Sequence, residues 1–218
     1  MTERELPAHM LRGQQTRDRV LGLAVEIARS EGLEALTIGR VAGINSITKA
    51  GLLGHFPSKV ELQLATIDAG RQAFFAAVVA PALERPAGAE RLGTLLRLWI
   101  DHVASKEGGC LFASIAAEFD SKPGVVRDRI AGLMREWLGA LGHMVEEAKA
   151  LGDLVATTDA QQLAFELHGH ELSMNLQVQL LGETIATARA AEAMRASIAT
   201  RATRRGKLTL AKGWELSR

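Results

Sequence analysis

A short stretch between Thr37 and Lys59 holds side chains that could recognise a phosphate-bearing polymer. Thr37 and Thr48 stand where their hydroxyl groups can accept hydrogen bonds from the free amides of a following helix. The amides at such a helix start face a phosphate favourably. Lys49 and Lys59 flank the second of these helices and could neutralise phosphates. The stretch therefore predicts a surface that binds a polyanion.

Two short helices with a turn between them are needed to position these groups. The pattern predicts one helix, IGRVAGI, after Thr37 and another, KAGLLG, after Thr48, with a break at Asn45 and Ser46. Inward-pointing small and aliphatic residues would lock the two helices together. The candidates are Ile38, Val41, Ala42, Ile47 and Leu52. This is the layout of a helix-turn-helix.

The segment TIGRVAGINSITKAGLLGHFPSKVEL resembles the DNA-binding region of TetR-family (tetracycline-repressor-type) regulators, and the resemblance covers about residues 16–64. In that family a threonine-led helix and a turn precede a recognition helix that ends in a His-Phe-x-Ser-Lys run. The resemblance implies that double-stranded DNA is met by Thr37, Thr48, Lys49, Ala50, Gly51, His55 and Lys59, and that Arg40 reaches the DNA backbone. His55 has an alternative role as a cation at the negative end of its helix.

Two positions depart from the family pattern. The turn residue that is usually glycine is Ser46, preceded by Asn45, so one of these two would adopt a left-handed conformation at some strain. Leu53 replaces the aromatic residue that usually touches a phosphate, and leucine cannot donate a hydrogen bond. We therefore expect operator affinity or sequence preference to differ from the family norm.

Helical periodicity extends over most of the chain and predicts an all-α fold with no strands. Residues 1–57 are expected to form an N-terminal arm (residues 1–13) and a three-helix, helix-turn-helix DNA-binding domain. Residues 58–202 are expected to form a helical bundle for ligand binding and dimerisation, and residues 203–218 a loosely ordered basic C-terminal tail. The capping box Ser58-Lys59-Val60-Glu61 opens a long helix to about Pro81, which is the expected lever between the two domains.

The helix expected near residues 159–182, which begins at a second capping box of Asp159 and Gln162, is apolar on more than one side. A helix buried on two faces usually packs against a second surface, such as a partner subunit. With the helix near 183–202, it would pair with its two-fold mates in a homodimer. Two recognition helices would then lie roughly 34–36 Å apart in successive major grooves of a near-palindromic operator.

Pockets in helical bundles are apolar with a few polar anchors, which suggests residues for a small-molecule effector site. The segments GGCLFASIAAEFDSKPGVVRD and DAQQLAFELHGHEL also resemble, more loosely, the ligand-binding half of one TetR subgroup. The apolar candidates are Trp99, Phe112, Trp137 and Met144, each with plain core packing as the alternative. The polar candidates are His102, Glu118, His168, His170 and Asn175.

Composition narrows the class of protein. The 218 residues are 47% hydrophobic, yet no apolar run approaches the roughly 20 residues of a spanning helix and no leader opens the chain, so we expect a cytoplasmic protein without a membrane partner. The single cysteine, Cys110, excludes an internal disulfide and a cysteine-based zinc site. Cys110 is expected to be a small buried hydrophobe, with a redox sensor as the alternative.

The charge is unevenly distributed along the chain. The net charge is +2 over residues 1–60, −7 over 61–194 and +6 over 195–218. A basic head on an acidic body is compatible with one end meeting a polyanion, and a solvated surface is the alternative interpretation.

The motifs of helical enzymes are missing. His168 and His170 are two residues apart and would point to different faces of a helix, and HELSM lacks the second histidine of a zinc protease. The chain has no Glu-x-x-His pair, Gly-x-Ser-x-Gly elbow, Walker A motif or Gly-x-Gly-x-x-Gly. We expect no catalysis, metal or cofactor. The resemblance implies a transcriptional repressor released from its operator by an effector, and the alternatives are a ligand carrier or scaffold with weakened DNA binding, or a helical enzyme.

Overall fold

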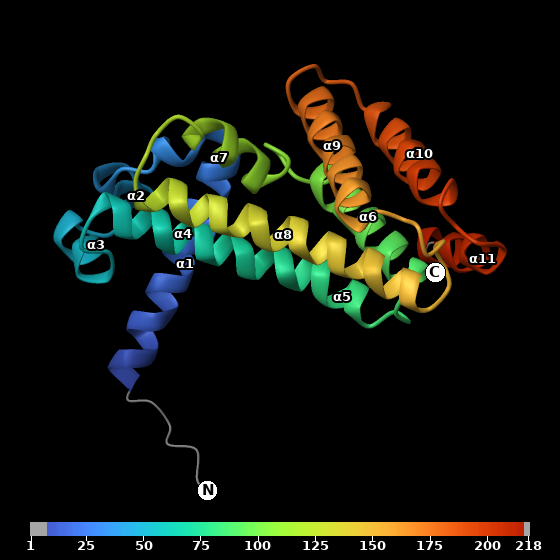
Figure 1. Cartoon of the computed structure of the whole chain (residues 1–218). Helices are drawn as coiled ribbons and strands as arrows, with labels where there is room; N and C mark the ends of the chain where they lie inside the picture. The colour runs from blue at the N-terminus through green and yellow to red at the C-terminus, as the bar shows by residue number, and fades with distance from the viewer. Residues whose placement is uncertain (1–7, 216–218) are drawn as a thin grey trace, which may run out of the picture.

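The computed structural model describes residues 8–215, which fold into helices joined by short connections (Figure 1). In chain order these are α1 (Ala8–Glu31), α2 (Ile38–Ile44), α3 (Lys49–His55), α4 (Lys59–Phe74), α5 (Ala80–Leu83), α6 (Ala89–Ala104), α7 (Leu111–Phe119), α8 (Val125–Ala150), α9 (Ala160–Gln179), α10 (Ala186–Ala199) and α11 (Arg204–Trp214). A 3-10 turn, η1 (Leu33–Ala35), follows α1, and a π-helical segment, η2 (Phe75–Val79), joins α4 to α5. The all-α prediction is confirmed.

The first three helices form the head, defined here as residues 8–57, and the other described residues form the body. Of the inward residues predicted for the head, Val41, Ala42 and Leu52 are buried, and Ile38 and Ile47 pack against them half-buried. The head core also takes in apolar residues of α7 and of the first half of α8. The head therefore shares its core with part of the body.

The predicted helix starts are capped as expected. The hydroxyl of Thr37 accepts a hydrogen bond from the amide of Arg40, and that of Thr48 from the amide of Gly51. The hydroxyl of Ser58 accepts from the amide of Glu61, the serine half of the capping box. These bonds fix the first turns of α2, α3 and α4.

The turn between α2 and α3 depends on Ser46, whose φ is 54°. The amide of Ser46 donates to the carbonyl of Gly43, and that of Ile47 to the carbonyl of Ala42, which closes the end of α2. Asn45 keeps a right-handed conformation, and its buried Nδ2 donates to the carbonyl of Val41. The left-handed position is thus taken by serine, at a cost of about 1–2 kcal/mol relative to glycine.

In the body, α4 and α8 lie side by side along the molecule, and α9 pairs with α10 at the end away from the head (Figure 1). The π-helical segment η2 precedes Pro81, whose ring would clash with the carbonyl four residues earlier in a regular helix. Within residues 8–215 no helix is both long enough and apolar enough to span a bilayer.

The predicted N-terminal arm is wrong over residues 8–13, because α1 begins at Ala8 and its first turns project from the head (Figure 1). Local bonds within these turns include Gln14 to Asp18 and Thr16 to the carbonyl of Arg12. Helix propagates readily from a packed segment, so these turns need no apolar stripe of their own. Residues 1–7 lie outside the described part.

The loosely ordered basic C-terminal tail is also wrong, because α11 spans Arg204–Trp214 and packs against α6. Thr203 caps it, and Leu210 is buried. Gly206 and Gly213 are also buried, and any side chain there would collide with backbone of the body, while Trp214 packs half-buried against the body core. Because two of the buried positions are glycines, only Leu210 and Trp214 mark the apolar face, and a single pair is too short a period to predict a helix.

Candidate functional site

The N-terminal turn of α3 presents the predicted recognition residues to solvent. Thr48, Lys49, Ala50 and Gly51 are all exposed, whereas Leu52 on the same helix is buried. The aliphatic stem of Lys49 lies over Gly39 on α2, which places the first turns of the two helices next to each other. The structure therefore brings these predicted residues together on one outer surface of the head, with exposed Thr37 at the start of α2.

Two of the predicted cations already pair with carboxylates of the head. Arg40 binds Glu31 of α1, and Lys59 Nζ lies 2.6 Å from Glu34 Oε2 of η1. These hydrogen bonds lower the pKa of both glutamates below its ordinary value. Both ion pairs are exposed to solvent and therefore weak, so a phosphate could replace either carboxylate at little cost.

His55 lies in the last turn of α3, and its carbonyl accepts a hydrogen bond of 2.8 Å from Arg17 Nη1 of α1. The Arg17 guanidinium also stacks on the buried ring of Phe56, 4.4 Å from its centroid. This contact fixes the end of α3 against α1. The His55 ring itself lies 6.3 Å from the ring of Phe56, at the C-terminal end of α3 where a cation is favourable. Leu53 is 42% exposed on the same helix.

A cavity of about 220 Å³ lies in the body where the head core and the body core meet. Of the predicted effector residues, Trp99, Phe112, Trp137 and His168 line it. Its other lining residues are Arg71, Phe74, Phe75, Val79, Cys110, Ala113, Leu133, Met134, Glu136, Ala140, Glu171 and Leu172. Aromatic rings from α4, α6, α7 and α8 thus surround one space.

Five predicted effector residues lie outside this lining. Met144 is core, His102 packs edge-on against Phe74, and Asn175 accepts a hydrogen bond from the amide of Cys110. Glu118 points to the head, because α7 packs against α1 and brings its last turn to η1. His170 contacts Ser197 of α10, which confirms that the two histidines of α9 face different ways.

Glu171 is the functional candidate that the sequence prediction missed. It is 1% exposed, and its Oε2 accepts a 2.8 Å hydrogen bond from Trp137 Nε1 and lies 3.0 Å from His168 Nδ1. Burial raises the pKa of Glu171, which outweighs the opposite effect of these two hydrogen bonds. The available signal was the spacing, because a carboxylate three residues after His168 lies on the same face of a helix as that histidine.

Replacing Glu171 with glutamine should stabilise the protein increasingly as the pH rises above the ordinary pKa of glutamate. Below the ordinary pKa of glutamate the carboxyl is neutral in both states. Above it, the unfolded chain ionises first, so the raised pKa of Glu171 costs the wild type stability that Glu171→Gln does not lose. Thermal melting of both proteins below and above the ordinary pKa of glutamate measures the difference, with exposed Glu136→Gln as control. A difference that does not change with pH would refute the expectation.

Cys110 is buried at the cavity wall, and burial raises the pKa of its thiol to about 11. The reactive form of cysteine is the thiolate, which this environment suppresses at neutral pH. The arrangement favours the structural interpretation of Cys110 over the sensor.

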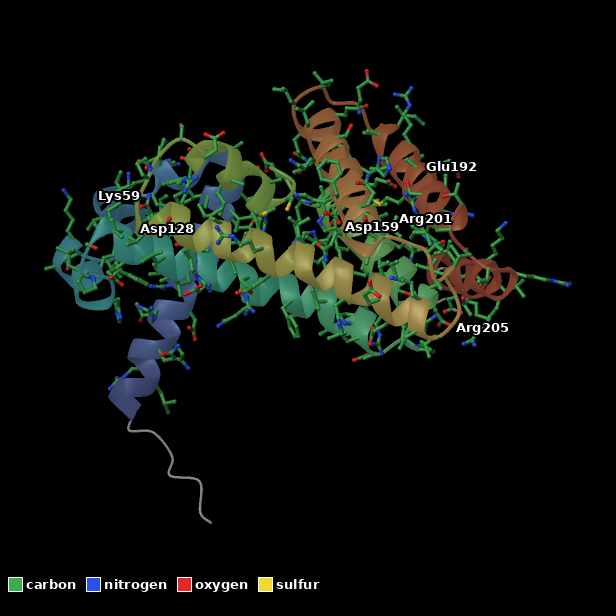
Figure 2. The ribbon with its side chains drawn as sticks, viewed as in Figure 1. Lys59, Asp128, Asp159, Glu192, Arg201 and Arg205 are labelled. Atoms are coloured by element: carbon green, nitrogen blue, oxygen red, sulfur yellow. The ribbon has the colours of Figure 1, made fainter. Side chains whose placement is uncertain are left out.

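The basic segment after residue 194 lies at the end of the molecule opposite Lys59, as Figure 2 shows for Arg201 and Arg205. Arg201 binds Glu166 of α9 at 2.7 Å, and Arg205 Nε lies 3.1 Å from Asp153 Oδ1. Arg201 and Arg205 therefore pair with acidic groups of the body, and they do not contribute to the predicted DNA-binding surface of the head.

Comparison with known proteins agrees with this architecture. Residues 88–194 match the family model for the C-terminal domain of tetracyclin repressor-like proteins. A TetR transcriptional regulator from Chloroflexus aurantiacus is 21% identical with a TM-score of 0.81, covering 88% of this chain and 98% of that one. A TetR-family transcriptional regulator from Streptomyces coelicolor is 20% identical with a TM-score of 0.75, covering 87% and 97%.

A putative transcriptional regulator from Saccharomonospora viridis, solved in complex with choline, is 20% identical with a TM-score of 0.73, covering 88% of this chain and 100% of that one. No curated protein matches the sequence significantly. The family model covers most of the body, and the solved structures share the fold of head and body together. Residues 88–194 therefore belong to the family of tetracyclin repressor-like C-terminal domains, and the chain has the fold of TetR-family regulators.

Proposed function

We propose that this protein is a homodimeric DNA-binding repressor that a small molecule releases from its operator. The observation that carries the proposal is the outer surface of α3. Its first turn exposes Lys49, Ala50 and Gly51, and its inner side is locked by Leu52. A short, rigidly backed helix with exposed small and basic residues suits insertion into a major groove.

The dimer would form through α9. Its exposed apolar side chains recur at helical spacing along one face and continue just past its end. They are Phe165, Leu172, Leu176 and Leu180. Monomeric proteins rarely expose a continuous apolar surface of this kind, which supports a partner subunit here. Two copies joined by a two-fold axis would present two α3 helices to one operator.

Two helices connect the cavity to the head. Helix α4 carries Lys59 in its first turn and the cavity residues Arg71 and Phe74 near its end. Helix α7 carries Phe112 at the cavity, and at its other end Glu118 accepts hydrogen bonds from the amides of Leu33 and Glu34 at 2.7 and 2.8 Å.

A ligand that shifts either helix would move the head. The dimer would exist in a form that binds DNA and a form in which the two heads are spread apart. The ligand can lower operator affinity only by as much as its affinity for the spread form exceeds its affinity for the DNA-binding form. The complex of the Saccharomonospora viridis regulator with choline supports small-molecule binding in this fold.

An electrophoretic shift assay with DNA from around the coding region tests DNA binding directly. We expect Lys59→Ala to weaken binding to every sequence and to flatten the salt dependence by about 0.9 in log-log slope for each lost phosphate contact. Lys49→Ala should instead change which operator is preferred. Exposed Lys207 on α11 provides the control, because Lys207→Ala should leave both properties unchanged.

Equal losses at every sequence from Lys49→Ala and Lys59→Ala would show that α3 reads no bases. A ligand-binding protein that has lost operator binding is the alternative function. It is favoured by Leu53, which cannot donate to a phosphate. In that case the wild type would shift none of the DNA fragments.

A further inference from the structure

We propose that the cavity binds a small hydrophobic amine in its protonated form, with an ammonium N–H donating to Glu171 Oε1. This inference rests on the proposed function, because it takes the cavity as the effector site and names the chemical class of the effector. Three features of the cavity carry it: an unpartnered carboxylate oxygen, a wall of aromatic rings and the balance of charges.

The first feature is the unpartnered oxygen. Both contacts of the Glu171 carboxylate, from Trp137 and His168, go to Oε2. Oε1 is buried and has no hydrogen-bond partner among the described residues, although Glu171 lines the cavity. A buried polar atom without a partner is costly, and a ligand that donates a hydrogen bond there removes the cost. The cavity therefore suits a ligand that donates a hydrogen bond to Glu171 Oε1.

The second feature is the aromatic wall. The ring of Phe74 packs edge-on against Trp137 and Phe112, with centroids 5.3 and 6.0 Å apart. Trp99 lines the same space from α6. Ring faces attract a cation within about 6 Å, and they also bury the apolar part of a ligand. An amine that carries an aromatic or branched aliphatic group matches both properties.

The third feature is the balance of charges around the cavity. Arg71 and Glu136 form a half-exposed ion pair at 3.0 Å, so their opposite charges cancel at the wall of the cavity. Cys110 is a neutral thiol, because burial raises its pKa to about 11. The remaining charged group is Glu171, with His168 on its other oxygen. An anionic ligand would face this buried carboxylate directly, and a cation would neutralise it.

A neutral ligand on a protonated Glu171 is the competing arrangement, because burial raises the pKa of this carboxyl. Oε2 accepts from the Trp137 indole and lies against His168 Nδ1, and an ammonium on Oε1 would add an opposite charge that favours the ionised form of Glu171. The volume of about 220 Å³ is below the range of roughly 300–1,000 Å³ typical for drug-sized ligands, so the amine must be small.

Calorimetric titration at pH 8, where Glu171 is more fully ionised, tests the proposal with three probes of nearly equal size. They are phenethylamine, phenethyl alcohol and phenylacetate. We expect the amine to bind at least about tenfold more tightly than the alcohol, and phenylacetate to bind most weakly. Glu171→Gln should lose about tenfold or more in amine affinity and bring amine and alcohol within about threefold of each other.

Glu84→Gln is the control, because it removes one carboxylate charge at an exposed position outside the cavity lining, and it should change amine affinity less than about twofold. Thermal melting establishes that each variant is folded. The proposal is overturned if the alcohol or phenylacetate binds wild type as tightly as the amine does. It is overturned equally by an unchanged amine preference in Glu171→Gln, or by no amine binding at millimolar concentration.

The shift assay on the same preparations separates this inference from the proposed function. DNA binding without amine binding refutes the inference alone. Amine binding by a protein that binds no DNA supports the inference and refutes the regulator. Amine binding that leaves DNA affinity unchanged supports the amine site and refutes operator release through this cavity.

Discussion

Leu176→Lys is expected to convert the protein to monomers and to lower its affinity for a two-half-site operator by roughly 10²–10⁴-fold. Leu176 is 51% exposed near the centre of the apolar face of α9. A lysine there would place one charge from each subunit at a two-fold interface, where neither finds a partner. Each monomer would keep its α3 but lose the second half-site. Sedimentation velocity gives the oligomeric state, and the shift assay gives the affinity.

Leu208→Lys is the control for this experiment. Leu208 lies on α11 and is 67% exposed, so it is a more exposed leucine that lies outside the apolar face of α9. We expect this variant to remain dimeric with unchanged operator affinity. Dimeric Leu176→Lys would show that another surface joins the subunits, and the proposal for α9 would then be abandoned.

The second large effect is expected from Glu118→Ala, which removes the hydrogen bonds between α7 and the head. Each hydrogen bond to a charged acceptor contributes about 1.5–3 kcal/mol. Because this carboxylate is partly exposed to water, we expect a total loss near 2 kcal/mol in the contact of head and body. Exchange of the amide hydrogens of Leu33 and Glu34 should quicken roughly 30-fold. Hydrogen exchange followed by mass spectrometry measures this rate.

Two variants sharpen the interpretation of the Glu118 experiment. Glu118→Gln keeps one acceptor oxygen and should show a smaller increase in exchange. Asp120→Ala removes a neighbouring exposed carboxylate just after α7 and should show none. If exchange at residues 33–34 is unchanged in Glu118→Ala, the carboxylate does not hold η1, and α4 remains the only proposed lever between cavity and head.

The head was predictable because its determinants are local. A threonine that caps a helix is recognised from its neighbours, and the apolar period of each short helix follows within one or two turns. Thr37, Thr48 and Ser58 each accept the predicted kind of bond. The strain at the turn was also predictable, because Ser46 stands where the family has glycine.

The cavity was only partly predictable because it depends on how distant helices pack. Trp99, Phe112 and Trp137 were identified as aromatic residues of the body, and the structure brings them together. Glu118 was assigned to the same site, but the direction of α7 takes it to the head. Glu171 was missed because a carboxylate on a helix is usually solvated, and its burial follows only from the packing of α8 against α9.

Hydroxyl-radical footprinting on the DNA that flanks the coding region tests the central proposal most directly, with Lys49→Ala as the comparison. We expect the wild type to protect two patches on one face of the duplex, about one helical turn or 34–36 Å apart, one for each α3. Lys49→Ala should lose or relocate both patches together. Absence of protection, or a single patch bound by a monomer, would contradict a dimeric regulator that reads DNA through α3.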